Sequence, residues 1–445
     1  MDRREFLNAG LSAPVVSQAA MAAPNEKIQQ ARDAALALLK PTRVQLEHGL
    51  ELHAQSLVVE PYGFAPRAAV DGDILRKALD AGASELELWD LDEEMFMTRC
   101  VTDAAERAEF MQAWDASGVT CIFQNAGEER QDPLVLMKRL SRFTYVADML
   151  GEYVRRGVEA DDMVAAKKQN RRCMFFATNG VPLPQDWVSV EQELRYIGMF
   201  AGLGVRSMHL TYQRRNMIGD GCGELGNAGL SDFGRAVVAE MNRVGVIIDV
   251  AHSGWRTSLE AARASSRPVV ASHTGCVAVH NHVRCKPDEV IRAICDSGGF
   301  IGVFAVADFL GLSRDIVAML AHVDHVVKHF GAEHVAIATD LVYVSRKSDE
   351  ENKKIPRRRR PRKGWEKLWP PGAATTGYDQ TRGLAWTNWP LFTVAMVQRG
   401  YSDTDIQKIL GGNVLRVARA VMPRKISLEG LRTVVTAHAG DFGPS

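Results

Sequence analysis

The sequence lacks three features that would assign the chain to a particular class of protein. No stretch after the N-terminus approaches the roughly 18 consecutive apolar residues of a membrane span. The 54 basic and 54 acidic residues cancel, so no overall field favours nucleic acid or an anionic membrane as a partner. None of the seven cysteines forms a CxxC pair, which argues against a disulfide framework or a zinc knuckle. We therefore expect no membrane span and no nucleic-acid partner, and cysteines that serve as small core residues.

The N-terminus differs in kind from the remainder of the chain. Arg3 and Arg4 precede a weakly apolar, alanine-rich run that ends in Ala20-Met21-Ala22. This order is typical of a twin-arginine export signal with a cleavage site, which predicts a periplasmic protein. The alternative is an ordinary N-terminal tail on a cytoplasmic protein. We assign residues 1–24 to the possible signal and residues 25–55 to an N-terminal helical extension.

Residues 56–422 alternate between short apolar runs and amphipathic segments with helical spacing. Eight such runs have strand length. This alternation predicts an α/β fold of the (β/α)8 TIM-barrel type, in which side chains at the carboxyl ends of the strands meet at one mouth. The predicted strands lie near residues 57, 119, 174, 208, 247, 269, 301 and 335. Residues 85–92 alternate like an exposed strand or turn, and Gly411-Gly412-Asn413 indicates a helix stop.

Two further segments of the chain stand apart from the predicted barrel. Residues 345–372 are rich in arginine, lysine and proline and cannot form a core element, so we interpret them as a solvated loop insertion. A nucleic-acid-binding patch is the alternative for this segment, although no other nucleic-acid motif accompanies it. Residues 423–445 are assigned to a C-terminal tail.

Two neighbouring predicted strands each lead to a histidine. His252 follows the run that starts at Val246, and His273 ends the run that starts at Pro268. A histidine at the end of a strand is often only a hydrogen-bonded structural residue. Asp340, however, follows the last predicted strand, and two histidines with an aspartate can bind a divalent metal and handle the proton of an attacking water. The pattern therefore predicts a metal site at the mouth.

These motifs resemble the renal or membrane dipeptidase family of metallopeptidases. The resemblance extends from about residue 55 to 422 and is most specific between residues 204 and 341. It implies an amidohydrolase-type (β/α)8 barrel that hydrolyses dipeptides at a two-zinc centre and commonly forms a homodimer. The segments that carry it are 204–212, 229–243, Asp249-Val-Ala-His252-Ser, Ser272-His273, Arg284 with Pro287-Asp288-Glu289, Gly298-Gly299, His322-Val-Asp-His325, Thr339-Asp340 and Gly411-Gly412-Asn413.

The resemblance also implies roles for individual residues. His252 and His273 match the two histidines of the second zinc site, and Asp340 matches the catalytic aspartate. Arg284 matches the arginine that binds the terminal carboxylate of the substrate, a role suited to its planar fork. Tyr212 stands where many members have a histidine that polarises the substrate. A dipeptide or a similar small molecule with a free carboxylate is therefore the expected substrate.

The ligands of the first zinc, however, are missing from their expected positions. The family's first strand ends in His-x-Asp, but here Tyr62-Gly63-Phe64 follows, and Asn179 lies near the position of the bridging glutamate. A shifted register that offers His53 and Glu60 instead is an alternative. We expect one divalent metal, most plausibly zinc, because a two-zinc centre depends on a bridging carboxylate.

Three functions remain open from the sequence. The first is a dipeptidase-like metallohydrolase with a reduced, single-metal site that cleaves an amide bond of a small peptide or amino-acid derivative. The second is a non-catalytic barrel that has lost its metal and binds small carboxylates. The third is a metal-independent isomerase or lyase in which His252, His273 and Asp340 act as acid and base.

Overall fold

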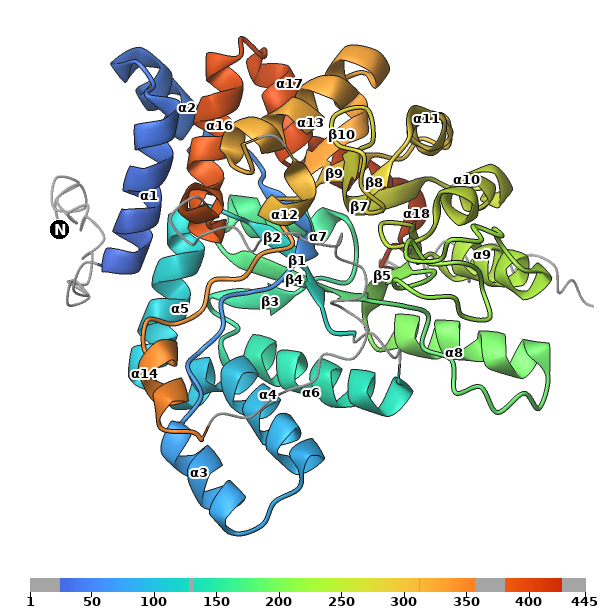
Figure 1. Cartoon of the computed structure of the whole chain (residues 1–445), viewed down its shortest axis with the longest axis horizontal. Coiled ribbons are helices and arrows are strands. Elements are labelled where there is room, and N and C mark those ends of the chain that lie inside the picture. The colour runs from blue at the N-terminus through green and yellow to red at the C-terminus, as the bar shows by residue number, and fades with distance from the viewer. Residues whose placement is uncertain (1–24, 128–131, 312, 357–380, 426–445) are drawn as a thin grey trace, which may run out of the picture.

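The structure is a computed structural model, and it describes residues 25–127, 132–311, 313–356 and 381–425. Eight parallel strands form the predicted barrel, at the centre of Figure 1, in the order β1-β2-β4-β5-β6-β7-β9-β10. The eight predicted strands are confirmed, with bounds shifted by a few residues. They are β1 (Val59–Gly63), β2 (Cys121–Asn125), β4 (Arg172–Thr178), β5 (Val205–His209), β6 (Ile247–Asp249), β7 (Val269–Cys276), β9 (Ile301–Val303) and β10 (Val335–Ile337).

Helices surround the barrel because the connections between parallel strands must cross back over the sheet. Two short strands lie beside it: β3 (Val154–Arg156) pairs with β4, and β8 (Cys285–Lys286) pairs with β7. The helices are α1 (Glu26–Leu39), α2 (Arg43–Gln55), α3 (Gly72–Asp80), α4 (Glu85–Thr102), α5 (Ala104–Ser117), α6 (Pro133–Met149), α7 (Asp161–Lys168), α8 (Val190–Gly202), α9 (Asp232–Val244), α10 (Trp255–Ala264), α11 (Asp288–Asp296), α12 (Ala307–Leu310), α13 (Ile316–Phe330), α14 (Ser348–Lys353), α16 (Trp389–Gln398), α17 (Asp403–Gln407) and α18 (Asn413–Val421).

The seam between β1 and β10 is held by a buried carboxylate. Glu60 in β1 accepts hydrogen bonds from the Thr339 backbone N–H (2.5 Å) and hydroxyl (3.1 Å), just after β10. The indole N–H groups of Trp386 and Trp389 donate to the same carboxylate, at 3.2 and 2.9 Å. Glu60 therefore links the first strand, the last strand and the C-terminal helical segment.

The segment that begins at Glu85 corrects one prediction. Its alternation of charged and apolar residues suggested an exposed strand or turn over residues 85–92, but the segment begins α4. Ser84 and Glu87 form a capping box, in which each side chain accepts a hydrogen bond from the other residue's backbone N–H. The cap fixes the helical start, which the alternating pattern alone does not reveal.

The Gly411-Gly412-Asn413 motif corrects a second prediction, that a helix stops there. The π-helical turn η6 (Lys408–Gly412) instead leads directly into α18. A Cβ atom at Gly411 would lie 2.3 Å from the Leu57 carbonyl oxygen. The glycine therefore allows this turn to approach the chain entering β1 closely.

The start of the predicted insertion 345–372 is described as far as residue 356. It forms α14, which lies beside α3 in Figure 1. There the Glu351 carboxylate accepts a hydrogen bond from the Gly72 backbone N–H at 2.8 Å. The export signal, much of the insertion and most of the C-terminal tail lie outside the described residues, so those assignments stay predictions. Within the described ranges, no helix is both long and apolar enough to cross a membrane.

Candidate functional site

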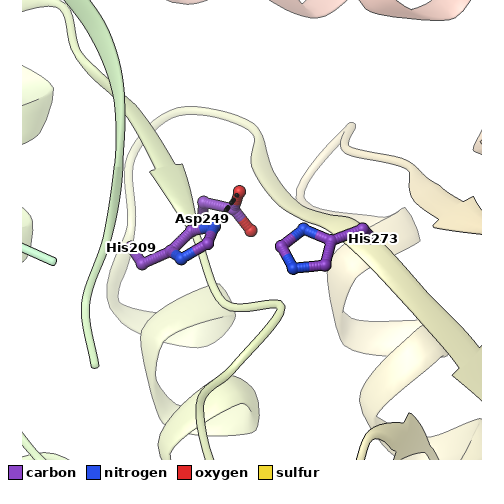
Figure 2. A group of neighbouring side chains, drawn as sticks. All are labelled: His209, Asp249 and His273. Carbon is purple, nitrogen blue, oxygen red and sulfur yellow. Dashed lines mark ion pairs between the residues drawn. The ribbon is translucent and has the colours of Figure 1, made fainter. Parts of the chain in front are cut away.

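Three polar side chains from neighbouring strands converge at the carboxyl ends of the barrel strands. His209 ends β5, Asp249 ends β6, and His273 lies within β7. His209 and Asp249 are register partners across the β5–β6 pair. One ligand atom from each of the three residues lies within 4.8 Å of the others, and Figure 2 shows the Asp249 carboxylate facing both imidazole rings. Each residue is at most 1% exposed, so the group is a buried cluster of metal-ligand type.

Asp249 supplies the negative charge of this cluster. One carboxylate oxygen, Oδ1, accepts hydrogen bonds from the backbone N–H groups of Ala251 (2.9 Å) and Ser272 (3.0 Å). The other oxygen, Oδ2, lies 2.9 Å from His209 Nε2. Burial alone would raise the pKa of the carboxyl, but His209 and the hydrogen bonds lower it below its ordinary value. Asp249 is therefore ionised at neutral pH, as a metal ligand must be.

The two histidines that the sequence singles out lie in contact. His252 Nε2 is 2.9 Å from His273 Nε2, and both residues are buried. Burial, and then the nearby Arg284 guanidinium, lowers the pKa of each ring well below its ordinary value. Both imidazoles are consequently neutral at pH 7 and can offer a lone pair to a metal or accept a proton from a substrate.

Two tyrosines hold these rings in place. The Tyr62 ring stacks on His273 with a centroid separation of 3.9 Å and an interplanar angle of 13°. The predicted substrate-binding residue Tyr212 stacks on His252 at 4.2 Å and 24°. Each imidazole is therefore packed against an aromatic face that restricts its rotation.

Arg284 lies beside the histidines but is held largely by backbone. Its Nη1 donates to the Ala251 carbonyl at 2.5 Å, and its Nη2 lies 3.3 Å from both the His273 carbonyl oxygen and His252 Nε2. Nε makes no hydrogen bond, and no ion pair links Arg284 to the described carboxylates. A buried guanidinium without a counter-ion is suited to an anionic ligand.

Asp340 follows β10 and adopts a left-handed backbone conformation, with φ of +55°. Burial raises the pKa of its carboxyl to about 7, although the Arg284 guanidinium opposes the rise. Burial, and then the Asp340 carboxyl, raises the pKa of Tyr62. A carboxyl with a pKa near neutrality can both accept and return a proton.

Tyr62 and Asn179 stand where the resemblance places ligands of a first metal. The Tyr62 hydroxyl donates a hydrogen bond of 2.5 Å to the Asn179 side-chain oxygen, and both residues are buried. Burial, the first cause, raises the pKa of the phenol well above its ordinary value. Both side chains are therefore uncharged and hydrogen-bonded to each other, so neither supplies an anionic metal ligand.

Neither His53 nor Glu60 replaces the missing ligands. His53 Nδ1 lies 2.8 Å from the Thr393 hydroxyl, and its Nε2 lies 2.9 Å from the Ser117 carbonyl oxygen. Glu60 is bound at the barrel seam. The alternative register considered from the sequence is therefore wrong.

His209 and Asp249 belong to the candidate metal group, but the sequence does not mark them as potential ligands. The positions predicted to face the mouth directly follow the strands, whereas His209 and Asp249 are the last residues within β5 and β6. The available signal was their shared position: each is the polar residue that ends a barrel strand. Together with His273 they provide two imidazoles and one carboxylate, a donor set suited to one zinc-like divalent ion.

Comparison with known proteins identifies the family of this chain. A model of the membrane dipeptidase family (peptidase family M19) matches residues 106–357. Dipeptidase verJ of Clonostachys rogersoniana is 30% identical over 222 residues, 49% of this chain and 49% of that protein. Dipeptidase tcpJ of Claviceps purpurea (strain 20.1) is 27% identical over 242 residues, 53% of this chain and 49% of that protein. The chain thus spans about half the length of the curated relatives it matches.

A solved structure supports the fold over a larger part of the chain. The crystal structure of an amidohydrolase from Pseudomonas aeruginosa superposes with a TM-score of 0.60 at 23% identity, over 84% of this chain and 99% of that one. The family model extends from α5 past α14 and covers more than half of the chain. This chain therefore belongs to the membrane dipeptidase family of metallopeptidases.

Proposed function

We propose that this chain is a dipeptidase-like metallohydrolase that cleaves an amide bond of a small peptide or amino-acid derivative and uses one divalent metal ion. The observation that carries the proposal is the buried group of His209, Asp249 and His273 beside a guanidinium without a counter-ion. Family membership adds the expectation of a metal. The neutral pair of Tyr62 and Asn179 limits the site to one ion, because it offers no carboxylate that could bridge two.

The ionised Asp249 carboxylate and the neutral His273 ring are in the protonation states that metal ligation requires. His273, which belongs both to the predicted histidine pair and to the buried group, would hold the ion together with its neighbours. A bound divalent ion, with zinc as the expected metal, would supply Lewis-acid polarisation and lower the pKa of water to about 7.

Arg284 would bind the free carboxylate of the substrate. Its unpartnered Nε and the absence of a described counter-ion leave charge and hydrogen-bonding capacity for such a ligand. Tyr212, packed on His252, would border the substrate on the same side of the mouth. The substrate class that fits is therefore a dipeptide or a derivative with one free carboxylate.

Asp340 would handle protons during hydrolysis. Its carboxyl has a pKa of about 7, so it can take a proton from the attacking water and return it to the leaving amine. General acid–base catalysis of this kind typically contributes about 10²–10⁴-fold in rate.

The experiment that tests the function combines metal analysis with hydrolysis. Protein purified without chelator is analysed for metal and then assayed against a panel of dipeptides of both stereochemistries, with and without added zinc, manganese or cobalt. We expect about one equivalent of metal and metal-dependent release of amino acids. Less than half an equivalent, together with no hydrolysis after metal addition, would rule out the proposal.

A second function is favoured by one specific observation. Tyr62 and Asn179 are uncharged and hydrogen-bonded to each other at positions where the resemblance implies metal ligands. This is expected for a barrel that binds small carboxylates without turnover. A thermal-shift screen separates the two functions. Stabilisation by dipeptides with no product formed under any metal condition would favour the binding protein, whereas turnover that is lost in His252→Ala would exclude it.

We also propose a homodimer and export through the twin-arginine pathway, both from the sequence. Light scattering coupled to size-exclusion chromatography measures the first. Replacing Arg3 and Arg4 together by lysine, followed by cell fractionation, measures the second. A monomeric mass would contradict the homodimer. An unchanged cellular distribution of the variant would contradict export through the twin-arginine pathway.

A further inference from the structure

We propose that Glu60 is a positioning residue for Asp340, because its buried side chain holds the backbone turn on which the Asp340 carboxyl is placed. This inference rests on the proposed function, in which Asp340 exchanges protons during hydrolysis. Glu60 would not contact the substrate. It would act on the reaction only through the turn at the end of β10.

The first argument is that the backbone determines where the Asp340 carboxyl lies. Within the described ranges, no hydrogen bond holds this carboxyl. Asp340 has a φ of +55°, a left-handed conformation that is uncommon and costly for residues other than glycine. Such a conformation persists only where the surrounding structure enforces it. Residues outside Asp340 must therefore fix the turn.

The second argument is that Thr339 fixes the turn from the preceding position. Its hydroxyl oxygen accepts a hydrogen bond from the Leu341 backbone N–H at 3.2 Å, which closes the turn around Asp340. Its carbonyl oxygen accepts a hydrogen bond from the Ala305 backbone N–H, just beyond β9, at 2.9 Å. Thr339 is buried, so water does not replace these contacts. The place of Asp340 therefore follows from the place of Thr339.

The third argument is that Glu60 binds both hydrogen-bond donors of Thr339. The Thr339 backbone N–H donates to Glu60 Oε1 at 2.5 Å, and the Thr339 hydroxyl donates to Oε2 at 3.1 Å. A hydroxyl has a single proton. Because that proton is directed to Glu60, a lone pair of the hydroxyl oxygen remains for the Leu341 N–H. Glu60 thus orients the group that closes the turn.

The fourth argument is that Glu60 is itself held from a distant part of the chain. The indole N–H groups of Trp386 and Trp389 both donate to Oε2. A Cβ atom at Gly63 would lie 2.9 Å from Glu60 Cγ, so a glycine there leaves room for this orientation of the side chain. The C-terminal helical segment is therefore connected to Asp340 through Glu60 and Thr339.

The alternative is that Glu60 only closes the seam of the barrel. A purely structural contact would lower stability without changing the turnover of the folded enzyme. The test must therefore separate kcat from KM and from stability. Three variants do so. Glu60→Gln puts an amide nitrogen, which can only donate, in place of one acceptor oxygen. Thr339→Val removes the hydroxyl and keeps the shape, whereas Thr339→Ser restores the hydroxyl.

Asn413→Ala is the matched control. Asn413 is buried like Glu60, but it holds the opposite end of β10, where its Nδ2 donates to the Val335 carbonyl at 2.8 Å. For each variant, kcat and KM are measured on a dipeptide that the native chain cleaves, with the supporting metal in excess. Circular dichroism and thermal unfolding establish that the variant is folded and how much stability it has lost.

We expect kcat to fall about 10–100-fold in Glu60→Gln and Thr339→Val, the scale reported for a misplaced reacting group. KM should stay within about threefold, because the proposed carboxylate contact of Arg284 is unchanged. Thr339→Ser should recover most of the native kcat. Asn413→Ala should lose stability and keep the native kcat.

Three results would overturn the positioning role and leave the proposed hydrolase intact. They are a native kcat in folded Glu60→Gln and Thr339→Val, equal losses in Thr339→Val and Thr339→Ser, and a loss in Asn413→Ala as large as that in Glu60→Gln. If Glu60→Gln does not fold, the two Thr339 variants decide. A native chain without turnover under any metal condition would overturn the proposed function, and the positioning role with it.

Discussion

At the scale of single residues, the site is a connected set of buried side chains in which His252 contacts both His273 and Arg284. His252, His273 and Arg284 could be found because a family motif marks them, and the structure brings all three into contact. His209 and Asp249 could not be assigned as ligands, because a strand-end residue reveals its neighbours only once strand register is known. Their pairing across β5 and β6 depends on how the strands align in the folded chain. The ligand roles of His252 and His273 and the roles of Arg284, Tyr212 and Asp340 stay predictions.

Arg284→Lys should selectively weaken the binding of substrates with a free carboxylate. Lysine keeps the charge but loses the planar fork that binds a carboxylate with two hydrogen bonds. A lost hydrogen bond to a charged group costs about 1.5–3 kcal/mol, so we expect KM to rise roughly 10–150-fold. The same dipeptide with an amidated C-terminus is the control, because general damage to the site would affect both substrates. An equal loss for the two substrates would contradict the role of Arg284.

The positions of the missing ligands lead to a second residue-scale prediction. Tyr62 and Asn179 already lie in hydrogen-bond contact, at positions that match the missing ligands. The triple change Tyr62→His, Phe64→Asp and Asn179→Glu should therefore raise the zinc content by about one equivalent. The double variant without Asn179→Glu is the control, since it lacks the bridging carboxylate. Equal metal content in the two variants and the native chain would mean that these positions do not form a first-metal site.

At the scale of elements, the alternation of helix and strand determines most of the architecture. All eight barrel strands could be predicted because each is a short apolar run bounded by helical periodicity. The errors fell where the local pattern is ambiguous. Charged residues alternate with apolar ones at the start of α4, where a capping box decides the structure. Glycines occur in η6 to permit close packing and not to end a helix.

Glu60 makes the seam between β1 and β10 sensitive to pH. Burial, opposed by the hydrogen bonds from Thr339, Trp389 and Trp386, raises the pKa of the Glu60 carboxyl from 4.5 to about 8. Because the folded-state pKa is raised, the folded chain holds this proton more tightly than the unfolded chain. The stabilisation is complete below pH 4.5 and is lost as pH rises through about 8.

Glu60→Gln removes this titration while keeping the size of the side chain. Between about pH 5 and 8 the native chain should lose stability relative to the variant, at up to roughly 1.4 kcal/mol per pH unit. Urea unfolding of metal-free protein at several pH values measures this difference. A difference in the free energy of unfolding that does not change with pH would contradict the raised pKa of Glu60.

At the scale of the whole molecule, a conserved type of scaffold carries an altered centre. The family model places the chain among membrane dipeptidases, while the uncharged pair of Tyr62 and Asn179 stands where the family resemblance implies ligands of a first metal. The buried group at β5, β6 and β7 is a candidate site for one divalent ion. The number of bound metal ions stays a prediction from the sequence. The sequence could not reveal that His209 and Asp249 meet His273, because their convergence depends on the arrangement of the barrel strands.

The number of metal ions bound per chain tests this account most directly. Native mass spectrometry of protein loaded with zinc and freed of excess ion counts the bound equivalents. The account predicts one zinc per chain in the native protein and none in the folded double variant His209→Ala, Asp249→Asn. Two zinc ions in the native chain, or one zinc retained by the double variant, would contradict it.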